Sequence, residues 1–115
     1  MSDTARNHQL NLRKPYLQLI ADGLKTIEVR VGYPKMRRIQ AGHELTFFSG
    51  DETVITHVKR VTEYTSFEDM LDHEDPVAIG GELGESKEEL LAAIRDIYPP
   101  DKEQLGVLAI EIERM

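Results

Sequence analysis

The feature that most restricts the fold is a long β-rich run from Glu52 to Tyr64. Successive side chains on a strand point to opposite faces, so the apolar positions of a simple half-buried strand keep one parity. In this run the parity changes between Ile55 and Val58, and again by Val61. A flat strand would leave part of this set exposed. The run therefore predicts a β-bulge or a strand that wraps around a barrel.

The rest of the chain alternates between strand and helix patterns. We predict strands over residues 8–12, 25–30, 44–49 and 106–113, and helices over residues 14–22, 66–71 and 86–97. The helices are marked by Pro15 at a first helical position and by capping-box patterns that begin at Ser66 and Ser86. We expect a basic loop with one helical turn at most over residues 31–42, and a short irregular segment over residues 75–81.

This order of elements argues against a parallel sheet, because the helices cannot all serve as crossovers between neighbouring strands. We predict an α+β fold, in which a small mixed or antiparallel β-barrel, partly closed, is flanked by helices. A chain of 115 residues is long enough for one domain and too short for two. We therefore expect a flexible N-terminus over residues 1–7 and a single domain over residues 8–115.

The composition argues against several classes of protein. The chain has no cysteine, which rules out disulfides and thiolate metal sites. It has no apolar run near 18 residues and no apolar segment close to its N-terminus, so we expect no membrane helix, no secretory signal and a cytoplasmic protein. The four histidines lack the spacing of metal ligands, so we expect no metal and no cofactor.

The charge is unevenly distributed along the chain. Net charge is −7, but residues 1–60 hold ten Lys and Arg against six Asp and Glu, a charge of +4. Residues 61–115 hold four basic and fifteen acidic residues, a charge of −11. This asymmetry suggests a molecule with one anion-attracting face. Solvated acidic helices beside scattered bases would produce the same totals, and the composition leaves both interpretations open.

A row of polar side chains lies on the predicted strand 25–30. Thr26, Glu28 and Arg30 share one face, and Lys25 lies at the mouth of the strand. Residues two apart on a strand are separated by about 6.5–7 Å, so one small ligand could contact the row. The alternative is an exposed row of ion pairs, which contributes about 0–1 kcal/mol to stability.

Several short motifs together resemble a known family, the ASCH domain (activating signal cointegrator homology) of the PUA-like superfamily. They are Lys14-Pro15-Tyr16, then Gly23-x-Lys25-Thr26-x-Glu28-x-Arg30, then the basic loop, then Gly42-x-x-Leu45. The resemblance extends over residues 9–112. It implies a PUA-like β-barrel with peripheral helices and a cleft lined by the Lys, Glu and Arg of the motif. It also implies that the protein binds RNA or a nucleotide-like ligand.

The expected ligand-binding residues are Lys14, Tyr16, Thr26, Arg30, Lys35, Arg37 and Arg38, with Lys25 and Glu28 beside them. Positive groups of the motif would hold an anionic or carbonyl oxygen, and its carboxylate would accept from an exocyclic amine. Tyr16 could stack on a base, or could belong to the core face of its helix. The basic loop could contact phosphates, or could be plain surface.

The resemblance also implies an enzymatic alternative. One bacterial branch of the family is an amidohydrolase that acts on N4-acetylcytidine through a Lys, a Thr and a Glu, and ribonuclease activity is reported in another. Here Lys25 matches the Lys, the Glu falls near Glu82 (or at Glu85 if one gap is placed in the alignment), and Glu28 stands where that branch has its Thr. The catalytic candidates are therefore Lys25 as base or nucleophile, Glu28, and Glu82 as proton shuttle.

The protonation of Lys25 matters for this alternative. The like charge of Arg30 and any burial would lower the pKa of Lys25, whereas Glu28 would raise it. The sequence leaves open which effect is larger. A third interpretation, a non-catalytic protein that binds a partner through its acidic second half, is also compatible with the composition. The partners we expect are RNA or a nucleoside or nucleotide ligand and no membrane, and the protein would be a monomer or a weak homodimer.

Overall fold

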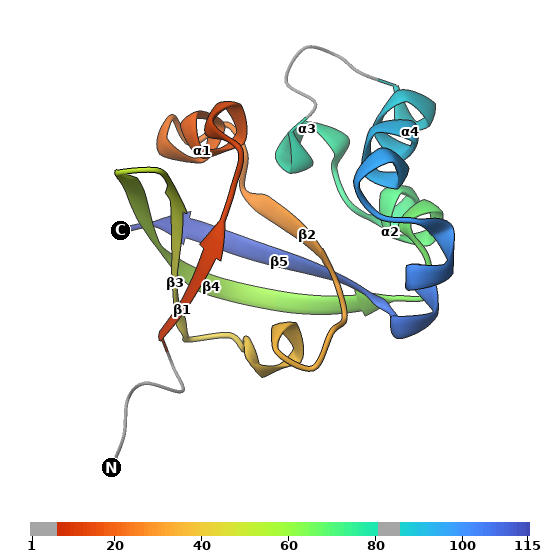
Figure 1. The fold of residues 1–115 in the computed structure, drawn as a ribbon, viewed down its shortest axis with the longest axis horizontal. Helices are drawn as coiled ribbons and strands as arrows, with labels where there is room; N and C mark the ends of the chain where they lie inside the picture. Colours follow the sequence, from red (N-terminus) through yellow and green to blue (C-terminus); the bar gives the residue numbers. More distant parts are fainter. Residues whose placement is uncertain (1–6, 81–85) are drawn as a thin grey trace.

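The computed structural model describes residues 7–80 and 86–115. The strands are β1 (Asn7–Asn11), β2 (Ile27–Val31), β3 (Glu44–Ser49), β4 (Glu52–Tyr64) and β5 (Val107–Arg114). The α-helices are α1 (Lys14–Ala21), α2 (Phe67–His73), α3 (Pro76–Ile79) and α4 (Lys87–Ile97), and two 3-10 helices, η2 (Met36–Arg38) and η3 (Pro100–Leu105), complete the order shown in Figure 1. Each strand and helix predicted from the sequence is present. The strands over residues 44–49 and 52–64 have the predicted bounds, and the ends of the other elements differ by one or two residues.

Three details differ from the sequence predictions. The segment around Pro76 is not irregular but forms α3, because the Asp75 side chain accepts a hydrogen bond from the backbone N–H of Val77 and Pro76 occupies the first turn. The strand predicted from residue 25 begins at Ile27. Of the N-terminal segment expected to be flexible, residues 1–6 lie outside the described residues, and Asn7 is the first residue of β1.

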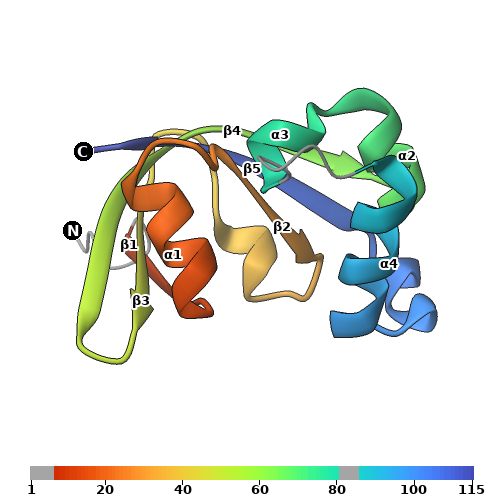
Figure 2. The same cartoon turned by 90° about the horizontal axis from the view of Figure 1, so that it is seen from above.

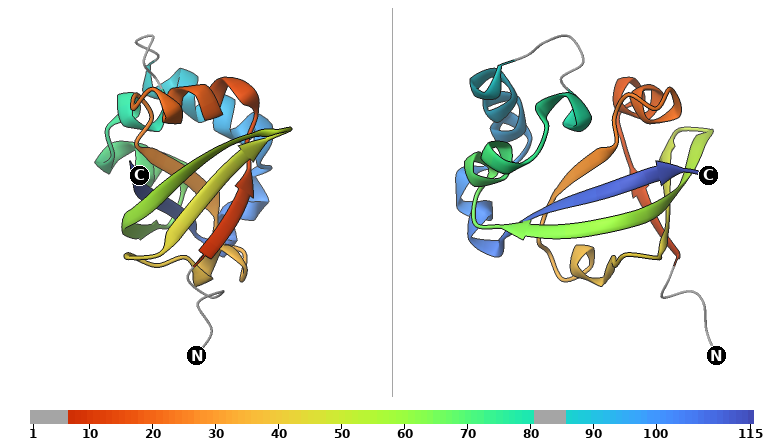
Figure 3. Two further views of the ribbon diagram at one scale, coloured as in Figure 1. Left: turned by 90° about the vertical axis from the view of Figure 1, so that its left-hand side faces the viewer. Right: turned by 180° about the vertical axis from the view of Figure 1, so that it is seen from behind.

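The five strands form one mixed sheet in the order β1-β3-β4-β5-β2. Strands β1 and β3 run parallel, and the other neighbours run antiparallel. Figures 1 and 3 show that the sheet is strongly curled, so that it forms a half-barrel with helices around it. The predicted α+β fold is therefore confirmed.

Of the two parity changes in the long β-rich run, the one between Val58 and Val61 has the predicted cause, whereas the one at Ile55 arises because that side chain points outward. Strand β4 pairs with β3 in its first half and with β5 along most of its length, and its register against β5 shifts between Val58 and Arg60. The shift is a β-bulge, and it lets Val58 and Val61 pack into the same core although their positions differ in parity. Ile55 remains 46% exposed on the outer face.

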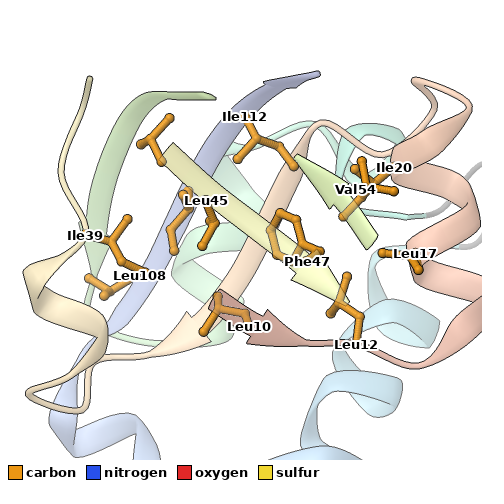
Figure 4. Close-up of a cluster of buried hydrophobic side chains, with 12 residues drawn as sticks. Leu10, Leu12, Leu17, Ile20, Ile39, Leu45, Phe47, Val54, Leu108 and Ile112 are labelled. Carbon is orange, nitrogen blue, oxygen red and sulfur yellow. The ribbon is translucent and has the colours of Figure 1, made fainter. Parts of the chain in front are cut away.

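Strand β5 joins two hydrophobic cores. Leu108, Ile110 and Ile112 face the core inside the half-barrel, where Phe47 of β3 is fully buried (Figure 4). The alternate residues of β5 face a second core beneath α2, α3 and α4. Because both faces of β5 are covered, its sequence is a nearly continuous apolar run.

The helices divide into two groups on either side of β2. Figure 2 shows α1 on one side of this strand and α3 and α4 on the other. Helix α1 packs against β3 and β4, whereas α2 and α4 pack against each other. Among the residues that the structure describes, no helix is long and apolar enough to cross a membrane.

Candidate functional site

A cleft of about 250 Å³ lies between the two groups of helices, over β2. Its walls are mostly apolar or aromatic and come from α1, α3 and α4. The wall residues include Leu12, Tyr16, Ile79, Leu90, Ile94, Ile97 and Tyr98. Its floor is charged and consists of Lys25, Glu28 and Arg30. A mostly apolar cleft with a few converging polar groups is the usual form of a small-molecule site.

The alternation of β2 explains why two of these charges reach the cleft. Ile27, Val29 and Val31 contribute to the second core, so Glu28 and Arg30 point to the opposite face. Lys25 has the parity of the core residues but precedes the strand, where its backbone N–H bonds to a carbonyl of α1. Strand alternation therefore does not direct its side chain, which turns toward Glu28.

The floor is a chain of hydrogen-bonded charges. Lys25 Nζ lies 3.2 Å from Glu28 Oε1, and Arg30 Nε donates to Glu28 Oε2 at 2.6 Å. Arg30 Nη2 also donates to the backbone carbonyl of Asn11 at 3.1 Å, which links β2 to the end of β1. Lys25 and Glu28 are each only 5% exposed. Each oxygen of the Glu28 carboxylate thus has one basic partner.

The surroundings of Lys25 determine whether its amine is protonated. Burial lowers the pKa of Lys25, and this effect outweighs the opposing effect of Glu28, while Arg30 lowers the pKa further. Yet Nζ also donates to the carbonyls of Ile27 at 2.6 Å and Ile79 at 2.7 Å. With Glu28 this makes three acceptors, and only an ammonium has three hydrogens to match them. We conclude that Lys25 is charged in this arrangement, with its pKa below the ordinary value.

Tyr98 is a cleft residue that the sequence analysis did not identify as a site residue. It follows α4 and lines the cleft, and its ring stacks on Phe67 with centroids 5.8 Å apart. Burial raises the pKa of its phenol, Arg30 lowers it, and Glu28 raises it. The Tyr98 hydroxyl is therefore close enough to Arg30 and Glu28 for their charges to affect its pKa. The sequence signal was a tyrosine at the end of an amphipathic helix, which is informative only once that helix is known to cover β2.

The structure brings some of the expected site residues together and separates others. Tyr16, Lys25, Glu28 and Arg30 all line the cleft. Lys14 is not among the lining residues. Its side chain is 71% exposed and pairs with Glu52 at 3.0 Å.

Thr26 lies away from the cleft. It lines a separate pocket that it shares with Lys59, Glu111 and Arg114, and its backbone N–H donates to the carbonyl of Ala78. The expected proton shuttle, Glu82, and its alternative Glu85 lie outside the described residues.

The guanidinium of Arg37 is bound to other parts of the fold and is not a free cation. Its guanidinium donates to both oxygens of Glu63 and to the carbonyls of Gly32 and Leu105. Gly32 is necessary here, because a Cβ at this position would lie 2.6 Å from the backbone carbonyl oxygen of Leu105. Lys35 and Arg38, from the same loop, line a second groove at the start of β1. Among the described residues, no group of three or more His, Asp or Glu could hold a metal ion.

The chain is similar to known proteins in both sequence and structure. The ASCH domain family model matches residues 10–115. The crystal structure of hypothetical protein PH0355 is 33% identical in sequence, with a TM-score of 0.86, and the match covers 95% of this chain and 99% of that one. The solution structure of protein PF0455 from Pyrococcus furiosus is also 33% identical, with a TM-score of 0.76 and coverage of 95% and 97%. No curated protein matches the chain.

Proposed function

The chain belongs to the ASCH domain family, and from that premise we propose that it binds RNA or a nucleotide in the cleft between α1, β2 and α4. The family membership confirms the resemblance identified from the sequence. The observation that carries the proposal is the combination of aromatic walls with a buried row of charges at the floor. This combination fits a flat base that has polar groups along one edge.

The size and walls of the cleft support a single base. Its volume of about 250 Å³ lies just below the range of roughly 300–1,000 Å³ that holds drug-sized ligands. Tyr16 and Tyr98 line opposite parts of it, from α1 and from the end of α4. Stacking of a base on an aromatic side chain contributes about 1–3 kcal/mol and tolerates any base.

The floor supplies the polar contacts, and its members have different roles. Arg30 uses Nε and one hydrogen of Nη2 for Glu28 and Asn11, so among the described contacts it keeps donors for a carbonyl or phosphate oxygen. Lys25 has no hydrogen left over, because its three acceptors are all protein atoms. We therefore assign ligand contact to Arg30 and Glu28, and assign to Lys25 the role of holding Glu28 in place.

Direct binding measurements test this proposal. The four ribonucleosides and a short single-stranded RNA would be titrated into the protein at low salt, with Arg30→Ala as the variant and Arg114→Ala as the control. Arg114 is also an arginine that donates to a backbone carbonyl, but it does not line the cleft. Loss of a charge-assisted hydrogen bond of about 1.5–3 kcal/mol should weaken binding tenfold or more for Arg30→Ala only. Equal affinity of both variants, or no binding of any probe, would contradict the proposal.

One observation favours a second function, hydrolysis of a modified nucleoside such as N4-acetylcytidine, or of RNA. A buried lysine with a lowered pKa beside a carboxylate, inside a cleft, is typical of catalytic sites. As base or nucleophile, Lys25 would first have to release one of its three acceptors together with a proton. Glu28 would orient it, and Glu82 remains our proposed proton shuttle on the basis of sequence alone.

An assay on N4-acetylcytidine and on short RNA decides between the functions. Lys25→Ala should abolish turnover, but this substitution also removes three buried contacts. Its folded fraction must therefore be measured, and Lys25→Arg, which keeps the charge but cannot deprotonate, serves as the matched variant. Turnover that survives in Lys25→Arg would rule out Lys25 as base or nucleophile. Absence of turnover in the wild type would leave the binding function alone.

A further inference from the structure

A second groove of about 690 Å³ lies at the start of β1, and none of the described residues that line it is a carboxylate. Its lining residues are Asn7, His8, Gln9, Leu10, Lys35, Met36, Arg38, Ile39, Gln40 and His43. Two of these are cations and two are histidines, on a chain whose net charge is −7. We call this the η2 groove. Its composition is that of a surface that attracts anions.

The two cations of the η2 groove differ from their neighbour Arg37. Arg37 is bound to Glu63 and to two carbonyls, so its donors are occupied within the fold. Within the described ranges 7–80 and 86–115, Lys35 and Arg38 form no ion pair. Cations near an edge strand often serve to block pairing with another sheet, but those cations belong to the strand itself. Lys35 and Arg38 instead come from the loop at η2.

The histidine pair provides a further donor. His8 Nε2 lies 2.9 Å from His43 Nδ1, and the rings are stacked with centroids 5.1 Å apart. The backbone N–H of Gln40 also approaches His43 Nδ1, at 3.3 Å. A backbone N–H can only donate, so His43 Nδ1 is an acceptor, and the proton between the rings belongs to His8. The neutral His43 therefore carries its own proton on Nε2, and this N–H donates no hydrogen bond to the described residues.

The η2 groove and the cleft are consecutive along one strand. Residues 7–10 line the groove, and residues 11–13 line the cleft. Figure 1 shows β1 running from beside η2 to the start of α1. At a rise of about 3.3 Å per residue the two sites are separated by roughly 12 Å. A nucleic-acid strand rises about 3.4 Å per nucleotide in helical form, so three or four nucleotides span this distance.

We propose that the η2 groove binds the backbone phosphates of a single-stranded RNA whose base occupies the cleft. Lys35 and Arg38 neutralise phosphates, and His43 donates a hydrogen bond from Nε2. The ligand is accordingly an RNA strand of several nucleotides and not a free nucleoside. This inference rests on the proposed function of the cleft. It adds a second site and decides between two classes of ligand.

Salt dependence of RNA binding tests the η2 groove. The probe is a fluorescein-labelled single-stranded RNA of eight nucleotides and mixed sequence, measured by anisotropy between 50 and 200 mM salt. The variant Lys35→Ala/Arg38→Ala is compared with Lys59→Ala/Lys102→Ala, which removes the same charge outside both sites. Each lost phosphate contact lowers the slope of log K against log salt by about 0.7 for single strands. We expect the slope to fall by about 1.4 in the first variant and to stay unchanged in the second.

The outcomes separate this inference from the proposed function. If the groove variant binds RNA with wild-type affinity and slope while Arg30→Ala is weakened, the η2 groove is overturned and the cleft stands. If the wild type binds ribonucleosides as tightly as the octanucleotide, the groove is likewise overturned and the cleft stands. If the wild type binds neither probe, the proposed function fails and the strand inference fails with it.

Discussion

Two carboxylates are buried in the described structure, Glu28 in the cleft and Glu74 at the end of α2, and an arginine holds each one. Glu74 accepts two hydrogen bonds from Arg60 and one from the hydroxyl of Tyr64, at 2.6 to 3.0 Å. Arg60 also donates to Glu111 and to Thr62. This second network joins β4, β5 and α2. None of its residues lines the cleft or the groove at the start of β1, and Glu111 lines the separate pocket that contains Thr26.

The two networks have similar residues but differ in how many arginine N–H donors remain unused. Arg60 uses four of its five N–H donors for the two carboxylates and Thr62, so the Glu74 network is a structural brace. Arg30 keeps donors and lines a cleft whose walls are apolar. The comparison teaches that a buried Arg–Glu pair becomes a candidate site through the donors it leaves unused and the space beside them, and not through its composition. The following predictions test this distinction, from the largest expected effect to the smallest.

Lys25→Met should cost the most stability. The substitution leaves two backbone carbonyls without their donor and leaves Glu28 buried with Arg30 as its only partner. Removing one member of a buried ion pair costs about 3–5 kcal/mol. Urea unfolding of the wild type and the variant measures the difference. A loss of unfolding free energy below about 1 kcal/mol would contradict the buried contacts of Lys25 with Glu28 and the two carbonyls.

Glu74→Gln should destabilise the protein without changing ligand binding. Arg60 is partly exposed, so water reduces the cost of losing its partner, and we expect a loss of about 2–3 kcal/mol. The matched control is Glu63→Gln, which breaks the exposed pair with Arg37 and should cost much less stability than Glu74→Gln, because water already screens that pair. Weaker RNA binding by folded Glu74→Gln would contradict the division between brace and site.

The Glu74 brace should also make the fold sensitive to acid. The hydrogen bonds from Arg60 hold the pKa of Glu74 below its ordinary value of 4.5. Its contribution to stability is therefore complete above about pH 4.5 and is lost as the pH falls through the lower pKa of the folded state. Glu74→Gln should lose less stability than the wild type between pH 5 and pH 3. Parallel pH profiles of unfolding free energy for the two proteins would refute this assignment.

Tyr98→Phe should produce the smallest effect. The ring keeps its stacking contact with Phe67 and its place in the cleft, so we expect stability and base stacking to change little. Tyr98→Ala removes the stacking surface and should weaken binding by about 1–3 kcal/mol. Calorimetric titration with the tightest-binding ribonucleoside compares the two variants. If Tyr98→Phe loses as much affinity as Tyr98→Ala, the hydroxyl and not the ring makes the important contact.

Much of the fold was predictable because its signals are local. The parity change around Val58 predicted the bulge in β4, and the alternation along β2 placed Glu28 and Arg30 on one face. Ser86 begins α4 with the capping box that its sequence indicates. These patterns act over two to five residues, so the sequence contains the whole of the physical cause.

The remaining features depend on partners that are far away in the chain. Glu74 meets Arg60 across 14 residues, and Arg37 meets Glu63 across 26. No local pattern indicated which of the basic residues in the loop would be occupied and which would remain free. Tyr98 likewise becomes a cleft residue only because α4 packs beside β2.

The sequence by itself determined the strands, the helices other than α3, the α+β fold with a curled sheet, and the family, because alternation, helix caps and short motifs are properties of neighbouring residues. Only the tertiary structure decided which charges form a site. Burial of Lys25 and the three oxygens around its Nζ arise when α3 closes over β2. The free donors of Arg30, Lys35 and Arg38 are those that the folded chain leaves without a partner among its described residues. Burial and hydrogen-bond satisfaction depend on long-range packing, and therefore they become visible only in the folded molecule.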